Sequence, residues 1–120
     1  MIKPYSETDS FTKGYVTTAL WSSTDEQGEP LDCYGWDDLS DDAQSEILED
    51  CAAFQDDHWD LIRSDPHRAG GDFWLTRNHH GAGFWDGDWP KPAATILTDA
   101  AHIYGSSDLY EGDDGKLYLA

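Results

Sequence analysis

Basic residues are scarce in this chain of 120 residues, which has 7 Lys and Arg, 25 Asp and Glu, and a formal net charge of -18. A charge of this size and sign repels nucleic acid and anionic lipid, whereas it attracts basic protein surfaces. The shortage of cations therefore excludes direct binding to nucleic acid and to membranes as expected functions. It favours a protein partner with a basic surface.

Long apolar runs and cysteines are also few. No run approaches the roughly 20 apolar residues that a membrane helix needs, and the opening MIKPY lacks the apolar core of a signal peptide. We therefore expect a soluble, intracellular protein. The 2 cysteines, Cys33 and Cys51, form neither a CxxC motif nor a disulfide framework, so free thiols are expected.

Aromatic residues are abundant, with 6 Trp, 6 Tyr and 4 Phe. They supply large apolar area per residue and separate this chain from acidic disordered tails, which are poor in aromatics. At this length the sequence predicts one folded domain that spans residues 1–120.

The clearest predicted element is a helix that starts at Ser40 or Asp41 and ends near Ser64, ahead of Asp65-Pro66. One face is apolar at helical spacing, with Ala43, Ile47, Cys51, Phe54, His58 and Ile62. The other face holds five carboxylates, Asp42, Glu46, Glu49, Asp56 and Asp60. At about 1.5 Å rise per residue, this acidic row is roughly 27 Å long.

Two further helices are expected. The spacing of apolar residues predicts one over residues 11–22, with Ser10 as its N-cap. Pro92 suits the first position of the other, whose apolar side includes Ile96 and which Gly105 ends.

Two β-hairpins are also expected. After a break at Gly70-Gly71, alternation over residues 72–78 predicts a strand that pairs with Phe84-Trp85. A second hairpin pairs Leu109 and Tyr110 with residues 117–119 across an Asp-Gly turn. The resulting order α-α-β-β-α-β-β predicts a small α+β domain with three helices and short antiparallel hairpins.

Four segments resemble a family of small, mostly uncharacterised proteins encoded by tailed bacteriophages: ALWSS (19–23), DFWLTRN (72–78), HGAGFWD (80–86) and SSDLYEGDDGKLY (106–118). The family more often has Gly where this chain has His79, and a basic residue where it has Gly87. The resemblance implies a phage accessory protein that acts in the host bacterial cytoplasm. It transfers no catalytic residue.

The acidic helix allows two interpretations. It is either a solvated face that keeps the protein soluble or adapts it to high salt, or a mimic of nucleic acid. Such a mimic occupies the phosphate-binding track of a host protein that handles DNA or RNA, for example a restriction or CRISPR protein. In the second case Asp86, Asp88, Asp108, Glu111, Asp113 and Asp114 add charge if the hairpin tips lie on the same side. The candidate partner-binding residues are Asp42, Glu46, Glu49, Asp56, Asp60, Arg77, Trp85, Asp86, Asp88 and Trp89. Trp85 and Trp89 flank an acidic turn, where we expect them to be at least partly exposed.

An enzyme is the alternative function. His80 with Asp72 or Asp86 supplies a general acid–base pair in principle, although Gly81 and Gly83 favour a simple turn. No nucleophile motif is present. The adjacent His79-His80 pair and the short Asp86–Asp88 segment lack the spacing of a metal site, so no metal or cofactor is expected. A virion accessory role is the third alternative.

Overall fold

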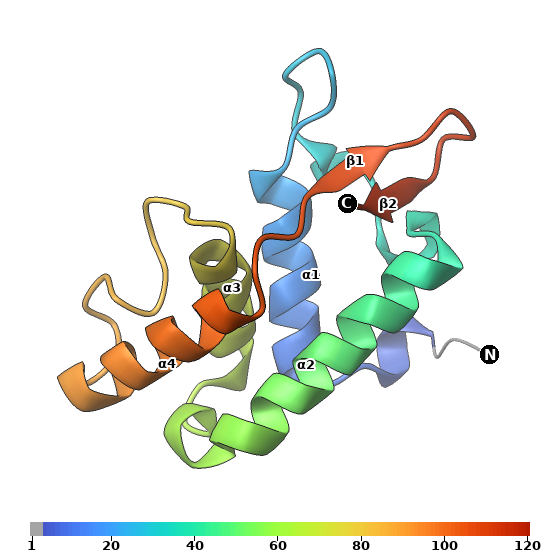
Figure 1. Ribbon diagram of the computed structural model, residues 1–120. Helices are drawn as coiled ribbons and strands as arrows, with labels where there is room; N and C mark the ends of the chain where they lie inside the picture. The colour runs from blue at the N-terminus through green and yellow to red at the C-terminus, as the bar shows by residue number, and fades with distance from the viewer. Residues whose placement is uncertain (1–3) are drawn as a thin grey trace.

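The computed structural model describes residues 4–120 and, within them, contains four α-helices and one antiparallel hairpin (Figure 1). The helices are α1 (Ser10–Ser22), α2 (Asp41–Ile62), α3 (Pro66–Arg77) and α4 (Lys91–Ile103), and the strands are β1 (Leu109–Glu111) and β2 (Leu117–Leu119). Short 3-10 turns occupy η1 (Tyr5–Glu7), η2 (Leu31–Cys33) and η3 (Trp36–Asp38). The α+β class is confirmed, but the helix count differs from the predicted three. Within residues 4–120, no helix is both long and apolar enough to cross a bilayer.

Helix α2 follows the prediction closely. The Ser40 side chain caps it by accepting a hydrogen bond from the amide of Ala43 at 3.1 Å. The apolar face is buried, and Phe54 is its centre, with ring centroids 4.2 Å from Phe73 and 5.7 Å from Phe84. The helix is interrupted at His58, where φ is -130° and ψ is 16°.

The predicted hairpin over residues 72–78 and 84–85 is wrong, because residues 66–77 form α3. Asp65 caps this helix by accepting from the amide of Arg68, and Pro66 occupies the first turn, where its missing N–H costs nothing. Local alternation of apolar residues suggested a strand, but both faces of this segment are buried, so alternation does not distinguish the two structures.

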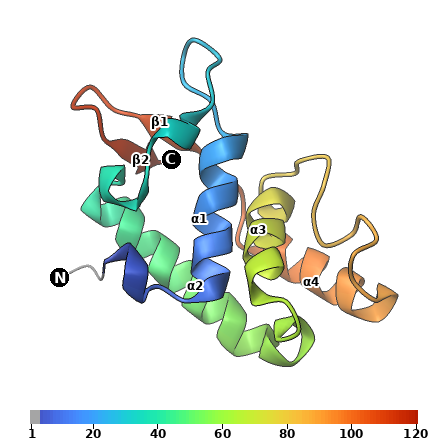
Figure 2. The ribbon, with the colours of Figure 1, turned by 180° about the vertical axis from the view of Figure 1, so that it is seen from behind.

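The sequence predicts a break at Gly70-Gly71, but both glycines lie inside α3. A Cβ on Gly70 would lie 1.9 Å from the backbone oxygen of Phe11 in α1. Reciprocally, a Cβ on Gly14 in α1 would lie 2.0 Å from the backbone oxygen of His67. The glycines therefore allow α1 and α3 to approach backbone to backbone, side by side in Figures 1 and 2.

Two helix ends differ slightly from the predictions. Asp9, not Ser10, caps α1, because its side chain accepts from the amide of Thr12 at 2.8 Å. Helix α4 begins at Lys91 and buries Leu97, whereas Ile96, predicted on its apolar side, is 49 % exposed.

The C-terminal hairpin is confirmed, with Leu109 opposite Leu119 and Tyr110 opposite Tyr118. Its second strand also reaches the start of α2, because the amide of Ser40 donates to the backbone oxygen of Leu117 at 2.8 Å. Leu117 is fully buried. The hairpin thus closes the core over the N-terminal end of α2 (Figure 1).

Candidate functional site

The acidic row lies on the solvent side of α2, as its spacing predicts. Asp42, Glu46, Glu49, Asp56 and Asp60 are all exposed, because the opposite side of the helix is packed into the core. Within residues 4–120 none of these five carboxylates forms an ion pair. The three ion pairs of the described chain are Arg68–Asp65, Arg68–Asp88 and Arg77–Asp50. No described residue therefore neutralises the acidic row by a direct ion pair.

A groove of mixed polar and apolar lining adjoins the C-terminal part of this row. It has a volume of about 430 Å³ and is lined by Asp56, Asp57, His58, Trp59, Asp60, Leu61 and Ile96. Trp59 is 45 % exposed and faces solvent together with Ile96. Large apolar side chains within a charged rim are the usual arrangement of an interface hot spot.

Arg77, a candidate partner-binding residue, is only 4 % exposed. Its guanidinium donates to the Asp50 carboxylate at 2.9 Å, to the Tyr15 hydroxyl at 3.0 Å, and to the backbone oxygens of Tyr104 and Gly105. Burial raises the pKa of Tyr15 well above its usual value, so this phenol stays neutral and accepts the bond. Arg77 therefore joins the helices and is not available to a partner.

The two tryptophans of the loop before α4 have different environments. Trp85 is 52 % exposed, as expected, but Trp89 is buried, and the expectation of an exposed Trp89 is wrong. The indole N–H of Trp89 donates to the Asp72 carboxylate at 2.7 Å, which gives the ring a polar partner inside α3. Burial raises the pKa of Asp72 to about 6.

The acids of this loop are partly engaged within the chain. Asp86 accepts from the amide of Gly83 at 3.2 Å, and Asp88 pairs with Arg68 at 3.0 Å. In Figures 1 and 2 this loop lies beside α3 and α4, whereas the C-terminal hairpin lies at the other end of the molecule. The loop that carries Asp86 and Asp88 therefore does not lie together with the hairpin that carries the remaining acids.

The His80 pair of the enzyme alternative is not assembled within residues 4–120. The imidazole of His80 is exposed and makes no hydrogen bond or ion pair there. Both proposed partners are engaged elsewhere, Asp72 with Trp89 and Asp86 with Gly83. His79 has a φ of 57°, and its ring stacks on His102 at 4.7 Å, so this segment forms a turn against α4.

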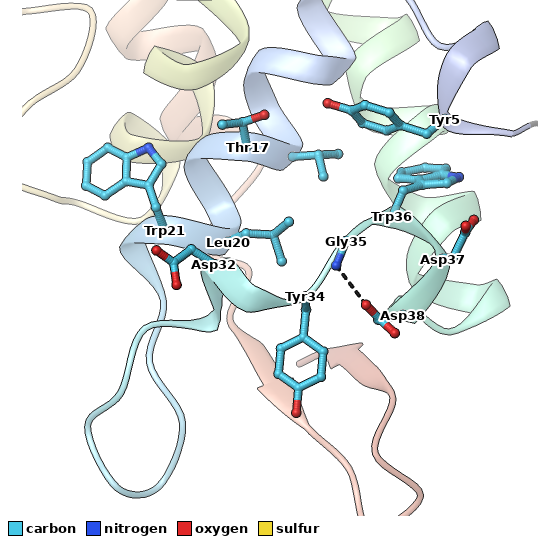
Figure 3. A pocket seen from close by; sticks show the side chains of 11 residues that line it. Tyr5, Thr17, Leu20, Trp21, Asp32, Tyr34, Gly35, Trp36, Asp37 and Asp38 are labelled. Carbon is cyan, nitrogen blue, oxygen red and sulfur yellow. Dashed lines mark hydrogen bonds between the residues drawn. The ribbon is translucent and has the colours of Figure 1, made fainter.

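A second groove, which sequence reasoning missed, has a volume of about 500 Å³. It is lined by Tyr5, Val16, Thr17, Leu20, Trp21, Asp32, Tyr34, Gly35, Trp36, Asp37 and Asp38 (Figure 3). No residue of α2 lines it. The signal in the sequence is the segment Asp32 to Asp38, DCYGWDD, in which aromatic and acidic residues are interleaved.

Among residues 4–120, no cluster of three or more His, Cys, Asp or Glu side chains is placed to hold a metal ion. The acidic row and the two grooves are exposed features that combine charge with apolar area, as binding interfaces do. Comparisons of the chain with protein-family models, with curated proteins and with solved structures found no significant match.

Proposed function

We propose that the protein binds a basic, nucleic-acid-binding surface of another protein and competes with nucleic acid for it. The observation that supports this function is the row of exposed, unpaired carboxylates on α2. An ordered helix presents these charges at fixed positions, so a track of Lys and Arg side chains can pair with several of them at once.

The charge density of the α2 row is lower than that of duplex DNA, which limits how closely the row can imitate a duplex. Duplex DNA has about one charge per 1.7 Å of axis, which is denser than one helix with a carboxylate every turn or two. The loop of residues 78–90 lies beside α3 and α4, and the C-terminal hairpin lies at the N-terminal end of α2 (Figures 1 and 2), so we compare the row with one strand of phosphates and not with a whole duplex. The groove at Trp59 and Ile96 adds apolar contact area, which supplies affinity that salt does not screen.

The resemblance to proteins of tailed phages indicates which partner to test. Host restriction and CRISPR proteins hold nucleic acid in basic channels, and a phage gains from blocking them. We therefore propose a stoichiometric inhibitor of a host defence or nucleic-acid-processing protein, acting in the bacterial cytoplasm.

The test neutralises four carboxylates of the row by Glu46→Gln, Glu49→Gln, Asp56→Asn and Asp60→Asn. A matched control removes the same charge elsewhere, by Glu26→Gln, Glu29→Gln, Asp108→Asn and Asp113→Asn, all at exposed positions. Both variants and the wild type are used to capture proteins from nuclease-treated bacterial lysate, and the captured protein is then titrated in a salt series.

We expect the α2 variant to lose affinity for the captured protein by about tenfold or more, because several charge-assisted contacts are lost together. The control variant should lose less than about threefold, through the long-range field alone. Short duplex or single-stranded DNA should displace the wild-type protein. The proposed function would be contradicted if the affinity for the captured protein did not change with salt, with the α2 substitutions or with competing DNA. Solubility would then be the remaining role of the acidic row.

A further inference from the structure

The second groove is built on α1 and the segment between η2 and η3. Val16 and Leu20, both buried residues of α1, contribute to its floor, and Trp21 stands at one end with 55 % of its surface exposed. Tyr5 and Trp36 form the opposite end, with ring centroids 6.4 Å apart (Figure 3). The groove therefore has an apolar floor between two aromatic ends.

Carboxylates accompany the aromatic rings at both ends. Asp32 lies at the Trp21 end and Asp37 at the Trp36 end (Figure 3), and neither forms an ion pair or side-chain hydrogen bond within residues 4–120. Asp38 differs, because its carboxylate accepts from the amide of Gly35 at 2.8 Å. The carboxylates of Asp32 and Asp37 are thus available to a ligand. The carboxylate of Asp38 instead holds the backbone of residues 32–38, which form one wall of the groove.

The wall is also fixed from the other side. The hydroxyl of Tyr34 donates to the carboxylate of Glu111 in β1, which ties the segment to the C-terminal hairpin. The side chain of Gln44 in α2 donates to the backbone oxygen of Trp36 at 2.8 Å. These bonds hold the groove in shape before a ligand arrives, which reduces the entropy lost on binding.

Aromatic faces, free carboxylates and an apolar floor together select one chemical class of ligand. A cation is attracted to the face of an indole and to a carboxylate, and the methylene groups that bear it gain by covering apolar surface. Guanidinium suits this site better than ammonium, because it is planar, stacks on aromatic rings and bonds a carboxylate with two donors.

We propose that this groove binds arginine side chains of an extended basic segment of the partner. The inference rests on the proposed function, since it assumes a basic partner, but it places a second contact on a surface that α2 does not form. The volume of about 500 Å³ lies in the usual range of ligand pockets, about 300–1,000 Å³, so it accommodates a short peptide segment. Trp21 with Asp32 forms one arginine-binding position.

The test measures binding of a short, end-blocked peptide with three arginines separated by glycines, by isothermal titration calorimetry at about 0.15 M salt. Trp21→Ala and Asp32→Asn remove the two contacts. Tyr110→Ala and Asp108→Asn are the matched controls, because Tyr110 is an exposed aromatic residue and Asp108 is an exposed acid, and both lie outside the groove. Thermal midpoints of all variants establish that each is folded.

We expect Trp21→Ala and Asp32→Asn each to weaken binding of the arginine peptide about fivefold to tenfold, and the controls to change it less than twofold. Trp21→Phe should retain most of the affinity, since it keeps an aromatic face. A lysine peptide of the same length should bind wild type more weakly and lose less affinity on Trp21→Ala than the arginine peptide does.

Equal losses in the groove variants and the controls would overturn the inference, because they would show that the peptide follows the overall negative field. Unchanged binding in the groove variants would overturn it as well. Neither result removes the proposed function, which depends on the α2 substitutions and on competition by DNA. Conversely, loss of the α2 effect with an intact groove effect would contradict the proposed function alone.

Discussion

At the scale of single residues, one guanidinium joins all four helices. Arg77 extends from α3 to Asp50 of α2, to Tyr15 of α1 and to the two carbonyls that follow α4. A buried charge is costly unless it is paired and its hydrogen bonds are satisfied, and here Arg77 has both an ion pair and several acceptors. Its charge therefore specifies how the helices meet and contributes nothing to the outer surface.

Asp72 is the other buried charge of α3, and its titration is predicted to lower stability as the pH rises. Burial raises its pKa from 3.8 to about 6, so the folded protein holds this proton more tightly than the unfolded chain does. The free energy of unfolding should therefore fall between about pH 4 and pH 6, and this loss remains above pH 6.

The variant Asp72→Asn tests this, because an amide oxygen still accepts the bond from Trp89 but cannot ionise. We expect it to be more stable than wild type at pH 7 by about 1–2 kcal/mol, allowing for partial solvent screening, and equal to it near pH 4. Urea denaturation at several pH values measures the difference. A constant difference across this pH range would show that Asp72 has the same pKa in both states.

At the scale of secondary-structure elements, the crossing of α1 and α3 depends on glycines in both helices. Glycine inside a helix costs about 1 kcal/mol relative to alanine, so these positions oppose helix formation locally. Packing of α1 against α3 offsets this cost, because each missing Cβ leaves room for a backbone oxygen of the other helix.

Gly70→Ala should therefore destabilise the protein by at least about 3 kcal/mol, despite the higher helix propensity of alanine. The added Cβ would meet the backbone of Phe11 at 1.9 Å, and neither backbone can yield without separating the helices. Gly81→Ala is the control, because a Cβ added there would have nothing within 4 Å, and it should change stability by less than about 0.5 kcal/mol. Chemical denaturation of both variants measures the effect, and a stable Gly70→Ala protein would contradict the close crossing.

The elements that sequence alone predicts well are those whose signals are local. The two-sided pattern of α2 and the Asp114-Gly115 turn of the hairpin depend only on neighbouring residues. Helix α3 is not predictable in this way, because the low helix propensity of Gly70-Gly71 indicates a break. Only the contact of these glycines with α1, which is distant in sequence, favours the helix. The site shows the same division, since exposure of the acidic row follows from periodicity, whereas burial of Arg77 and Trp89 depends on residues distant in sequence.

At the scale of the whole molecule, the net charge of -18 implies repulsion among carboxylates that the fold leaves unpaired. Raising NaCl from about 0.01 M to about 0.15 M shortens the Debye length from about 30 Å to about 8 Å. The thermal midpoint should therefore rise by several degrees, about 3–5 °C for a gain near 1 kcal/mol in a domain of this size.

The α2 variant with four neutralised carboxylates separates local from global repulsion. If the row on α2 is a main source of repulsion, this variant should start with a higher midpoint at low salt and gain less on salt addition than wild type. Calorimetric scans at both salt concentrations provide the comparison. Identical salt responses in the two proteins would assign the repulsion to the rest of the surface.

The junction between β2 and the start of α2 has a consequence for how the protein is made. Leu117 follows the end of α2 by about 55 residues. Its side chain completes the core, and its backbone oxygen accepts a hydrogen bond from the amide of Ser40. At about 5–20 residues per second, the ribosome needs about 3–11 s to reach Leu117, whereas helices form in microseconds. During those seconds the core at the N-terminal end of α2 lacks Leu117, and the row of carboxylates on α2 should repel other chains of the same sequence while that end is open.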